Sequence, residues 1–242
     1  MIKIDKEPGV YGWWEATMGM RNPMNSWDKR DSGWFERNPR DGEIQVDTDF
    51  EEWTNLIIGP SDQKLMLTLR NAGTVHRKFM RMITVYVDIT APLFWWKEFD
   101  TYKVGTVANS CSTMHKIAAK EFTVDDFSHE HLDGVSRDMF IQNDHDQPYF
   151  FCSFEDMLYI QVEALNRARN LYLKTKDKKY WWQMIQLLPS SYNQRRTVML
   201  NYEVLTNMYH ARKNHKLDEW VEFCEWIKTL PYSELITGEK AE

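Results

Sequence analysis

The most regular alternation of apolar and polar residues in this chain lies between Met82 and Thr90. Every second residue is aliphatic, and Thr, Tyr, Asp and Thr occupy the positions between. A period of two predicts a β-strand with one buried face, formed by Ile83, Val85, Val87 and Ile89. Pro92 follows and is typical of the first turn of a helix, so the stretch LFWWKEFDTYK is predicted to be helical.

Helical periods dominate the second half of the chain. The segment Ser153–Asp156 has the capping-box pattern and is predicted to open a long helix. Its buried face would carry Leu158, Val162, Leu165 and Tyr172. Ser61 is the expected N-cap of an earlier helix, and Gly73 its terminator. This earlier helix is predicted over Ser61–Ala72. The other predicted helices are Tyr180–Leu188, Thr197–Lys213 and Leu217–Leu230, the last ended by Pro231.

Three segments show weaker patterns. Residues 12–20 are amphipathic, and residues 21–42 are too rich in Asn, Pro, Ser and Gly for regular structure, although Trp27, Trp34 and Phe35 there are expected to be buried. Residues 121–146 hold eight acids and one base, which predicts a solvated acidic loop or short helices. Neither repeats nor linkers divide the chain, so we predict one mixed α/β domain over residues 1–242.

Composition narrows the function classes. Of 242 residues, 30 are basic and 36 acidic, and the net charge of −6 argues against a nucleic-acid-binding surface. The sequence contains no run of ~18 apolar residues, so no membrane partner is expected. The beginning of the chain lacks the apolar core of a signal peptide. Three widely spaced cysteines are expected to be free thiols in a reducing cytoplasm. The 11 tryptophans fit either a planar ligand or a Trp-rich core or interface.

Candidate chemistry gathers in two places. The stretch 101–112 combines small hydroxyls, an amide and a cation, which favours a polar ligand. Asn201 and Arg212 are eleven residues apart and share one helical face, which suits a ligand with polar ends, although a surface ion pair would explain Arg212 as well. The pair His129 and His131 does not have zinc-site spacing, and no metal is predicted. The known phosphate-loop, dinucleotide and hydrolase motifs are also missing, and Ser112 beside Cys111 has no assignable base.

Several of these residues together resemble the flavin-dependent thymidylate synthases, in particular divergent phage-type relatives called thymidylate synthase complementing proteins. The resemblance extends in order over about residues 12–230, and residues 121–150 match least. It rests on His76 before the strand, Ala91–Phe94, the signature region 101–114, Leu188–Pro189, and the helix with Asn201, Asn207 and Arg212.

The resemblance implies a fold, ligands and an assembly. The expected fold is mixed α/β (α+β), with a central antiparallel-rich sheet flanked by long helices. The expected reaction is methylation of dUMP to dTMP, or a related one-carbon modification at C5 of a pyrimidine nucleotide. FAD would be the cofactor, NADPH and methylenetetrahydrofolate the co-substrates, and the protein a homotetramer with its sites at subunit interfaces.

The resemblance also assigns site residues. Arg212 is the expected catalytic residue and holds the pyrimidine, with Ser110 and Ser112 as further substrate-binding residues. The expected flavin-binding residues are His76, Thr101, Tyr102, Lys103, Thr106, Asn109, Asn201, Asn207 and His215. Arg21 is a further residue that the resemblance brings near a ligand.

Several family cations are missing from this chain. Thr101, Tyr102 and Lys103 replace an Arg-His-Arg triplet, Met114 replaces a phosphate-binding arginine, and Glu203 replaces a flavin-side arginine. A buried phosphate must be neutralised, so another set of cations is needed. The candidates are Lys97, Lys103, Lys116, Arg195 and Arg196. The alternative is a degenerate family member that binds a nucleotide or a protein partner without catalysis.

Overall fold

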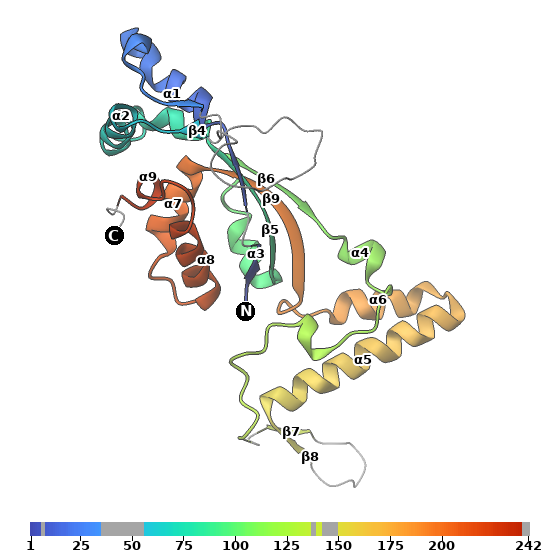
Figure 1. Ribbon diagram of the computed structural model, residues 1–242. Helices are drawn as coiled ribbons and strands as arrows, with labels where there is room; N and C mark the ends of the chain where they lie inside the picture. Colours follow the sequence, from blue (N-terminus) through green and yellow to red (C-terminus); the bar gives the residue numbers. More distant parts are fainter. Residues whose placement is uncertain (6–7, 35–55, 137–138, 142–149, 239–242) are drawn as a thin grey trace, which may run out of the picture.

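A five-stranded antiparallel sheet lies at the centre of the computed structural model, which describes residues 1–5, 8–34, 56–136, 139–141 and 150–238 (Figure 1). The strand order is β1-β5-β9-β6, and β2 pairs with the same edge of β5 as β1. The central pair, β5 with β9, is in register from Thr84 opposite Asn201 to Pro92 opposite Asn193. The strands are β1 (Lys3–Ile4), β2 (Gly9–Tyr11), β5 (Thr84–Pro92), β6 (Thr106–Ser110) and β9 (Asn193–Asn201).

One face of this sheet is buried and the other is open. The predicted alternation is confirmed, because Val85, Val87 and Ile89 are buried while Tyr86 is 48% exposed. The buried face forms one hydrophobic cluster with residues of α3 (Leu93–Phe99), α7 (Tyr202–Arg212), α8 (Asp218–Lys228) and α9 (Glu234–Thr237). A sheet with one face packed and one face free is common for antiparallel strands.

The region after β5 corrects one prediction. Pro92 is the last residue of β5 and the N-cap of α3, so it precedes the helix instead of lying in its first turn. The helix ends at Phe99, four residues earlier than the predicted stretch, and the Thr101 hydroxyl donates back to the carbonyl of Glu98 at 2.7 Å. Trp95 and Trp96 are fully buried and anchor α3 in the aromatic core.

The predicted helix over Thr197–Lys213 was wrong in its first part. Residues up to Asn201 belong to strand β9, whose Val198 and Leu200 are buried against β5, and only Tyr202–Arg212 are helical. No glycine or proline marks the change from strand to helix. Asn201 makes the change itself: it ends the strand and caps α7, and its Oδ1 accepts from the Val204 N–H at 2.9 Å.

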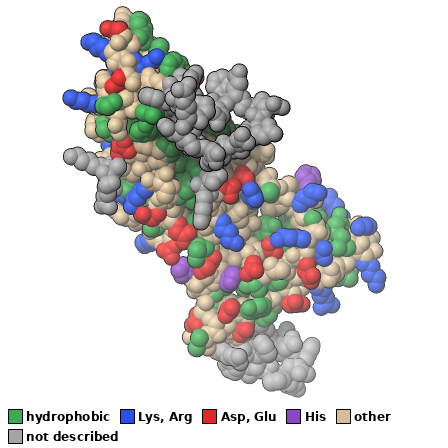
Figure 2. All heavy atoms as spheres, in the orientation of Figure 1, with side chains coloured by type: hydrophobic (Ala, Val, Ile, Leu, Met, Phe, Trp, Pro, Cys, Tyr) green, Lys and Arg blue, Asp and Glu red, His purple; other side chains and the backbone are tan. Residues whose placement is uncertain are grey.

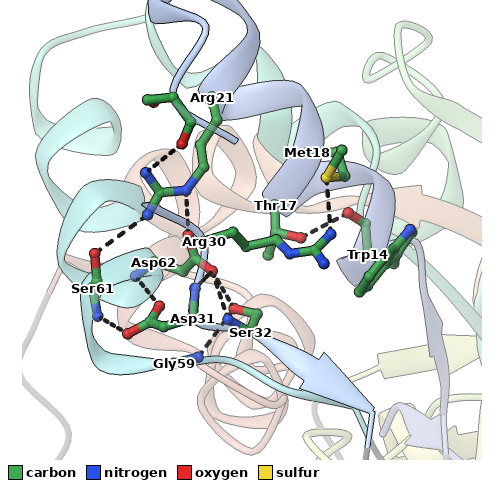
Figure 3. A network of polar contacts seen from close by, with 11 residues as sticks. Trp14, Thr17, Met18, Arg21, Arg30, Asp31, Ser32, Gly59, Ser61 and Asp62 are labelled. Atoms are coloured by element: carbon green, nitrogen blue, oxygen red, sulfur yellow. Dashed lines mark hydrogen bonds and ion pairs between the residues drawn. The ribbon is translucent and has the colours of Figure 1, made fainter. Parts of the chain in front are cut away.

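A buried ion pair fixes the N-terminal helix α1 (Trp13–Arg21) to α2 (Pro60–Asn71) (Figure 3). Arg21 Nε donates to Asp62 Oδ1 at 2.7 Å, and the side chains are 4% and 0% exposed. Arg21 therefore has a structural role in this junction, and its position near a ligand stays a prediction. Ser61 is not the N-cap of α2: Gly59 holds that position, and the carboxylate of Asp31 accepts from the first backbone N–H groups, those of Ser61 and Asp62.

Short elements lie between α1 and α2 and between α2 and β5. They are the 3-10 helices η1 (Asn22–Met24), η2 (Trp27–Lys29) and η3 (Arg77–Arg81), and the strand pair β3 (Gly33–Trp34) and β4 (Leu56–Ile57). The predicted burial of Trp27 was wrong: it is 46% exposed, and its indole N–H donates to Asn22 Oδ1 on the surface. The side chain of Trp34 and residue Phe35 lie outside what the structure describes.

Helices α5 (Phe154–Thr175) and α6 (Lys178–Leu187) form an arm beside the sheet (Figure 1). The predicted capping box at Ser153 and Asp156 is confirmed, and Leu158, Val162 and Leu165 lie in a second hydrophobic cluster. Basic side chains gather at the far end of the arm (Figure 2). Near the arm lie α4 (Thr113–Lys116), η4 (Val124–Asp126), β7 (Met139–Ile141) and β8 (Phe150–Cys152). The predicted acidic loop lies partly outside the described residues.

Two sequence predictions concern the chemistry of the whole chain. All three cysteines are free: Cys111 is exposed, whereas Cys152 and Cys224 are buried. Among the described residues, no helix has both the length and the apolar composition needed to cross a membrane.

Candidate functional site

Arg212, the last residue of α7, lies at the centre of a polar cluster built from three helical segments. Its Nη1 donates to Glu98 Oε2 at 2.7 Å, and its Nε donates to the hydroxyl of Tyr102 at 3.0 Å. The guanidinium carbon lies 4.8 Å from the centre of the Trp220 ring, and the Trp220 indole N–H donates to the same Glu98 oxygen at 3.0 Å. A flat cation stacked on an indole and held by two oxygens is a rigidly oriented donor.

His215 completes this cluster. Its Nε2 lies 3.0 Å from Arg212 Nη1 and 3.6 Å from Glu98 Oε2. The backbone N–H of Leu217 donates to His215 Nδ1 at 3.2 Å, and this bond fixes the orientation of the ring beside Arg212. The predicted site residues Tyr102, Arg212 and His215 are therefore neighbours in one chain. Glu98 and Trp220 join them, and the sequence analysis did not select either residue.

The predicted site hydroxyls at and before the start of β6 donate to nearby backbone carbonyls of their own chain. Thr101 Oγ1 donates to the Glu98 carbonyl, and Thr106 Oγ1 donates to the Tyr102 carbonyl at 2.5 Å. Gly105 has φ of +84°, and a side chain at this position would collide with the amide of Asn201. The glycine thus permits the close approach of this segment to the start of α7. Lys103 is exposed and has no ion pair among the residues the structure describes.

A second polar cluster surrounds the N-terminal half of α7. Glu203 is only 8% exposed and pairs with Arg81 and, at 3.5 Å, with Arg77, both from η3. Arg77 Nη2 also donates to Asn207 Oδ1 at 3.0 Å. A pocket of about 230 Å³ opens here, and its lining includes Arg81, Glu203 and the predicted site residues Asn201 and Asn207.

Arg77 and Arg81 belong to this candidate cluster, and the sequence analysis did not select either residue. Glu203 was the available signal, because a carboxylate on the buried side of a helix needs a cationic partner. One glutamate and two arginines leave the cluster with a net charge of +1. His76 is exposed at the start of η3, and its backbone N–H donates to the carbonyl of Gly73.

The remaining predicted residues lie along and after the edge strand β6. Asn109 pairs with Thr197 and Ser110 with Arg196 across the ladder to β9, and both are exposed. Ser112 caps the short helix α4, its Oγ accepting from the His115 N–H at 3.1 Å. Among the described residues, the polar partners of Arg212 are Glu98, Tyr102 and His215, so one chain does not bring Asn109 or Ser112 into contact with Arg212.

The two arginines of β9 pair with nearby aspartates of the same chain. The hydroxyl of Thr197 and the guanidinium of Arg195 both donate to Asp88, and these hydrogen bonds lower the pKa of its carboxyl group. Arg196 donates to Asp100 Oδ1 at 2.8 Å, and its guanidinium carbon lies 4.3 Å from the centre of the Trp96 ring. Both arginines of β9 therefore hold structural contacts in a single chain.

Comparisons with known proteins identify the fold. No protein-family model and no curated protein matches this sequence. Two crystal structures of the thymidylate synthase ThyX from Helicobacter pylori, both with FAD and dUMP, match with TM-scores of 0.63 and 0.61 at 15% identity. The first match covers 98% of both chains. PolB from Streptomyces cacaoi, a UMP/dUMP methylase crystallised with 5-Br dUMP, matches with a TM-score of 0.53 at 14% identity and covers 95% of this chain. The chain thus has the mixed α/β fold of the flavin-dependent thymidylate synthases, as the resemblance implied.

Proposed function

We propose that this protein binds FAD and a pyrimidine nucleotide such as dUMP, and transfers a one-carbon unit to C5 of the pyrimidine. The observation that carries the proposal is the agreement in fold over 98% of both chains with a flavin-dependent enzyme crystallised with these two ligands. Methylenetetrahydrofolate as the carbon donor and NADPH as the reductant are part of the proposal. Bound FAD would supply the hydride chemistry, and the protein would bind and orient the reactants.

Arg212 is the residue that we propose to hold the pyrimidine. Glu98 and Tyr102 fix its Nη1 and Nε, and Nη2 has no hydrogen bond to a described residue. The side chain is 20% exposed, so Nη2 can donate to a carbonyl oxygen of the base. A donor fixed before the ligand arrives stabilises charge that develops on that oxygen without needing to reorient.

The pocket beside Asn201 and Asn207 is the proposed place for part of the flavin cofactor. The residues there fit an anionic group, because Arg81 lines the pocket and the neighbouring Arg77 Nε, which lies 3.5 Å from Glu203 Oε1, is buried and makes no hydrogen bond to a described residue. The amide of Asn207 supplies further hydrogen-bonding capacity. Arg77 and Arg81 of η3 thus take the place of the family arginine that position 203 lacks.

We propose that the complete site needs more than one copy of the chain, as in a homotetramer. Asn109, Ser110 and Ser112 do not reach Arg212 within a described chain, and they lie along an exposed sheet edge. The open face of the sheet carries exposed apolar side chains, among them Tyr11, Tyr86 and Val107. A second copy packed near this face would cover them and bring β6 toward another Arg212.

The first test is the colour of the purified protein. We expect a flavin absorbance band at about 450 nm with roughly one flavin per chain. The second test is turnover of dUMP with methylenetetrahydrofolate and NADPH, followed by detection of a C5-modified nucleotide. Protein that stays colourless and does not bind added FAD would contradict the proposal.

One observation favours a second candidate function, binding of a nucleotide or protein partner without turnover. The hydroxyls of Thr101, Thr106 and Ser112 all bond to backbone groups of their own chain, and Met114 supplies no charge. Binding of dUMP without reduction of added flavin by NADPH would support this alternative.

A further inference from the structure

A cavity of about 660 Å³ opens between one end of the sheet and the α4–η4 segment. Its floor is the end of strands β1, β5 and β9, where Lys3, Thr90 and Arg195 lie in register. Its wall includes Cys111, Ser112 and Thr113, which follow β6, and then Lys116 and Lys120. The cavity thus begins at the predicted substrate residue Ser112, the N-cap of α4.

The lining of this cavity is cationic. It includes Lys3, Lys116, Lys120 and Arg195 against Asp125 and Asp126, which leaves two positive charges in excess. Lys120 pairs with Asp126, and Arg195 pairs with Asp88 and, at 3.8 Å, with Asp5. Lys3 and Lys116 have no ion pair among the described residues. An anion in the cavity would therefore meet two uncommitted ammonium groups.

Neutral groups in the same cavity add hydrogen-bonding capacity. The Ser112 oxygen already accepts from the His115 N–H, so its hydroxyl proton is free to be donated to a ligand. Asn193 Oδ1 is buried and has no partner in the described part of the chain. Burial raises the pKa of Tyr192, so its hydroxyl stays protonated and can donate. Such a mixture suits a phosphate joined to a group that carries a hydrogen-bond donor, such as a sugar hydroxyl.

We infer that this cavity binds the phosphate and sugar of the pyrimidine nucleotide, with Lys116 and Lys3 as its phosphate-binding cations. The inference rests on the proposed function. It explains how the nucleotide phosphate is neutralised in a chain that has Met114 in place of the family's phosphate-binding arginine. Lys116 lies on the same short helix, two residues further on, and supplies the charge from there. In the assembly proposed above, Arg212 of another copy would hold the base of the same nucleotide.

The test compares dUMP with deoxyuridine, which lacks the phosphate, by calorimetric titration of the full-length protein loaded with FAD. The variants are Lys116→Gln and Lys3→Gln. Lys64→Gln on α2 is the matched control, because it removes an exposed lysine at the other end of the molecule (Figure 1). We expect wild-type protein to prefer dUMP, and each cavity variant to lose about tenfold in dUMP affinity with unchanged deoxyuridine affinity. The control should change neither.

Three outcomes separate the inference from the proposed function. A tenfold loss confined to dUMP supports the cavity as the phosphate site. Equal dUMP affinity in wild type and both cavity variants overturns the inference and leaves the proposed function intact. If the FAD-loaded wild type binds neither dUMP nor deoxyuridine, the proposed function fails, and the inference fails with it. Unchanged thermal unfolding of the variants excludes misfolding as the cause of any loss.

Discussion

Arg212 Nη1 lies 2.7 Å from Glu98 Oε2, so the arginine proposed to hold the pyrimidine is already paired with a carboxylate from α3. The Trp220 indole donates to the same oxygen, which fixes the carboxylate in turn. The pair neutralises most of the arginine charge but leaves Nη2 available. The arrangement therefore selects a ligand by the direction of one donor more than by net charge.

This geometry predicts the effect of Arg212→Lys. A lysine ammonium is a compact point charge without the planar fork of the guanidinium, so it does not reproduce the separate donor directions toward Glu98, Tyr102 and the ligand. We expect pyrimidine nucleotide affinity to fall by about tenfold or more, with little change in thermal stability. Titration with dUMP measures the effect. Arg167→Lys on the exposed side of α5 is the control, and equal losses in both variants would remove Arg212 from the site.

Arg81→Gln tests the replacement of the missing cofactor cation. Arg81 is 56% exposed, so solvent screens its charge, and we expect a loss of about fivefold in FAD affinity. Riboflavin, which has no phosphate, should bind equally well to variant and wild type. Quenching of flavin fluorescence measures both affinities. Lys78→Gln removes a neighbouring exposed charge from η3 outside the pocket lining, and the same loss there would point to a general field effect.

Asp62→Ala should be the most destabilising single change at the α1–α2 junction. It would leave Arg21 buried without its partner and remove the acceptor for the backbone N–H groups of Asp31 and Ser32. We expect the free energy of unfolding to fall by about 3–5 kcal/mol. Urea denaturation measures this loss. Asp28→Ala on exposed η2 should cost less than about 0.5 kcal/mol.

Asp31 predicts a pH dependence of stability. Burial alone would raise the pKa of its carboxyl group, but hydrogen bonds from the backbone N–H groups of Ser61 and Asp62 outweigh it and lower the pKa. A folded pKa below the unfolded value stabilises the protein above roughly pH 4, and this stabilisation disappears as the pH falls through the folded pKa. The stability difference between wild type and Asp31→Asn should therefore be largest near neutral pH. Denaturation between about pH 7 and 3 measures it, and a difference that grows toward acid would contradict the assignment.

The three thiols should react at different rates. Cys111 is exposed, whereas Cys152 is fully buried, and burial raises the pKa of Cys224 to about 11. The thiolate is the reactive form, so brief treatment of native protein with iodoacetamide should modify Cys111 alone. Peptide mass mapping locates the label. Rapid labelling of Cys224 would show that α8 opens readily.

The sequence predicted the parts of the fold in which local pattern and tertiary burial agree. Strand β5 alternates cleanly because only one face of it is buried, and α5 carries a capping box before a long apolar stripe. Strand β9 was not predicted because the three consecutive residues Arg195–Thr197 are polar and hide the alternation, although Arg196 lies on the opposite face from Arg195 and Thr197, against Trp96. A second reason is that Asn201 joins strand to helix without a loop. The sheet pairing with β5 decides its conformation, and that pairing is invisible in a local window.

Only those candidate site residues that match a family motif were predictable from the sequence. Tyr102, His215 and Arg212 were chosen from the resemblance, and they are neighbours in the structure. Glu98 and Trp220 were not chosen, because their contacts with Arg212 depend on how α3, α7 and α8 pack. In the sequence, a glutamate at position 203 where the family has an arginine suggested a loss of function. In the structure, Arg77 and Arg81 of η3 lie beside Glu203 and supply positive charge there.

The direct joint between β9 and α7 has a consequence for specificity. The helix has eleven residues, so Asn201 and Arg212 stand about 16 Å apart along a rigid rod whose base is anchored in the sheet. A single residue inserted into this rod would swing Arg212 around the axis by about 100° and away from Glu98. The length of α7 therefore sets the distance between the two proposed binding positions at the ends of this helix.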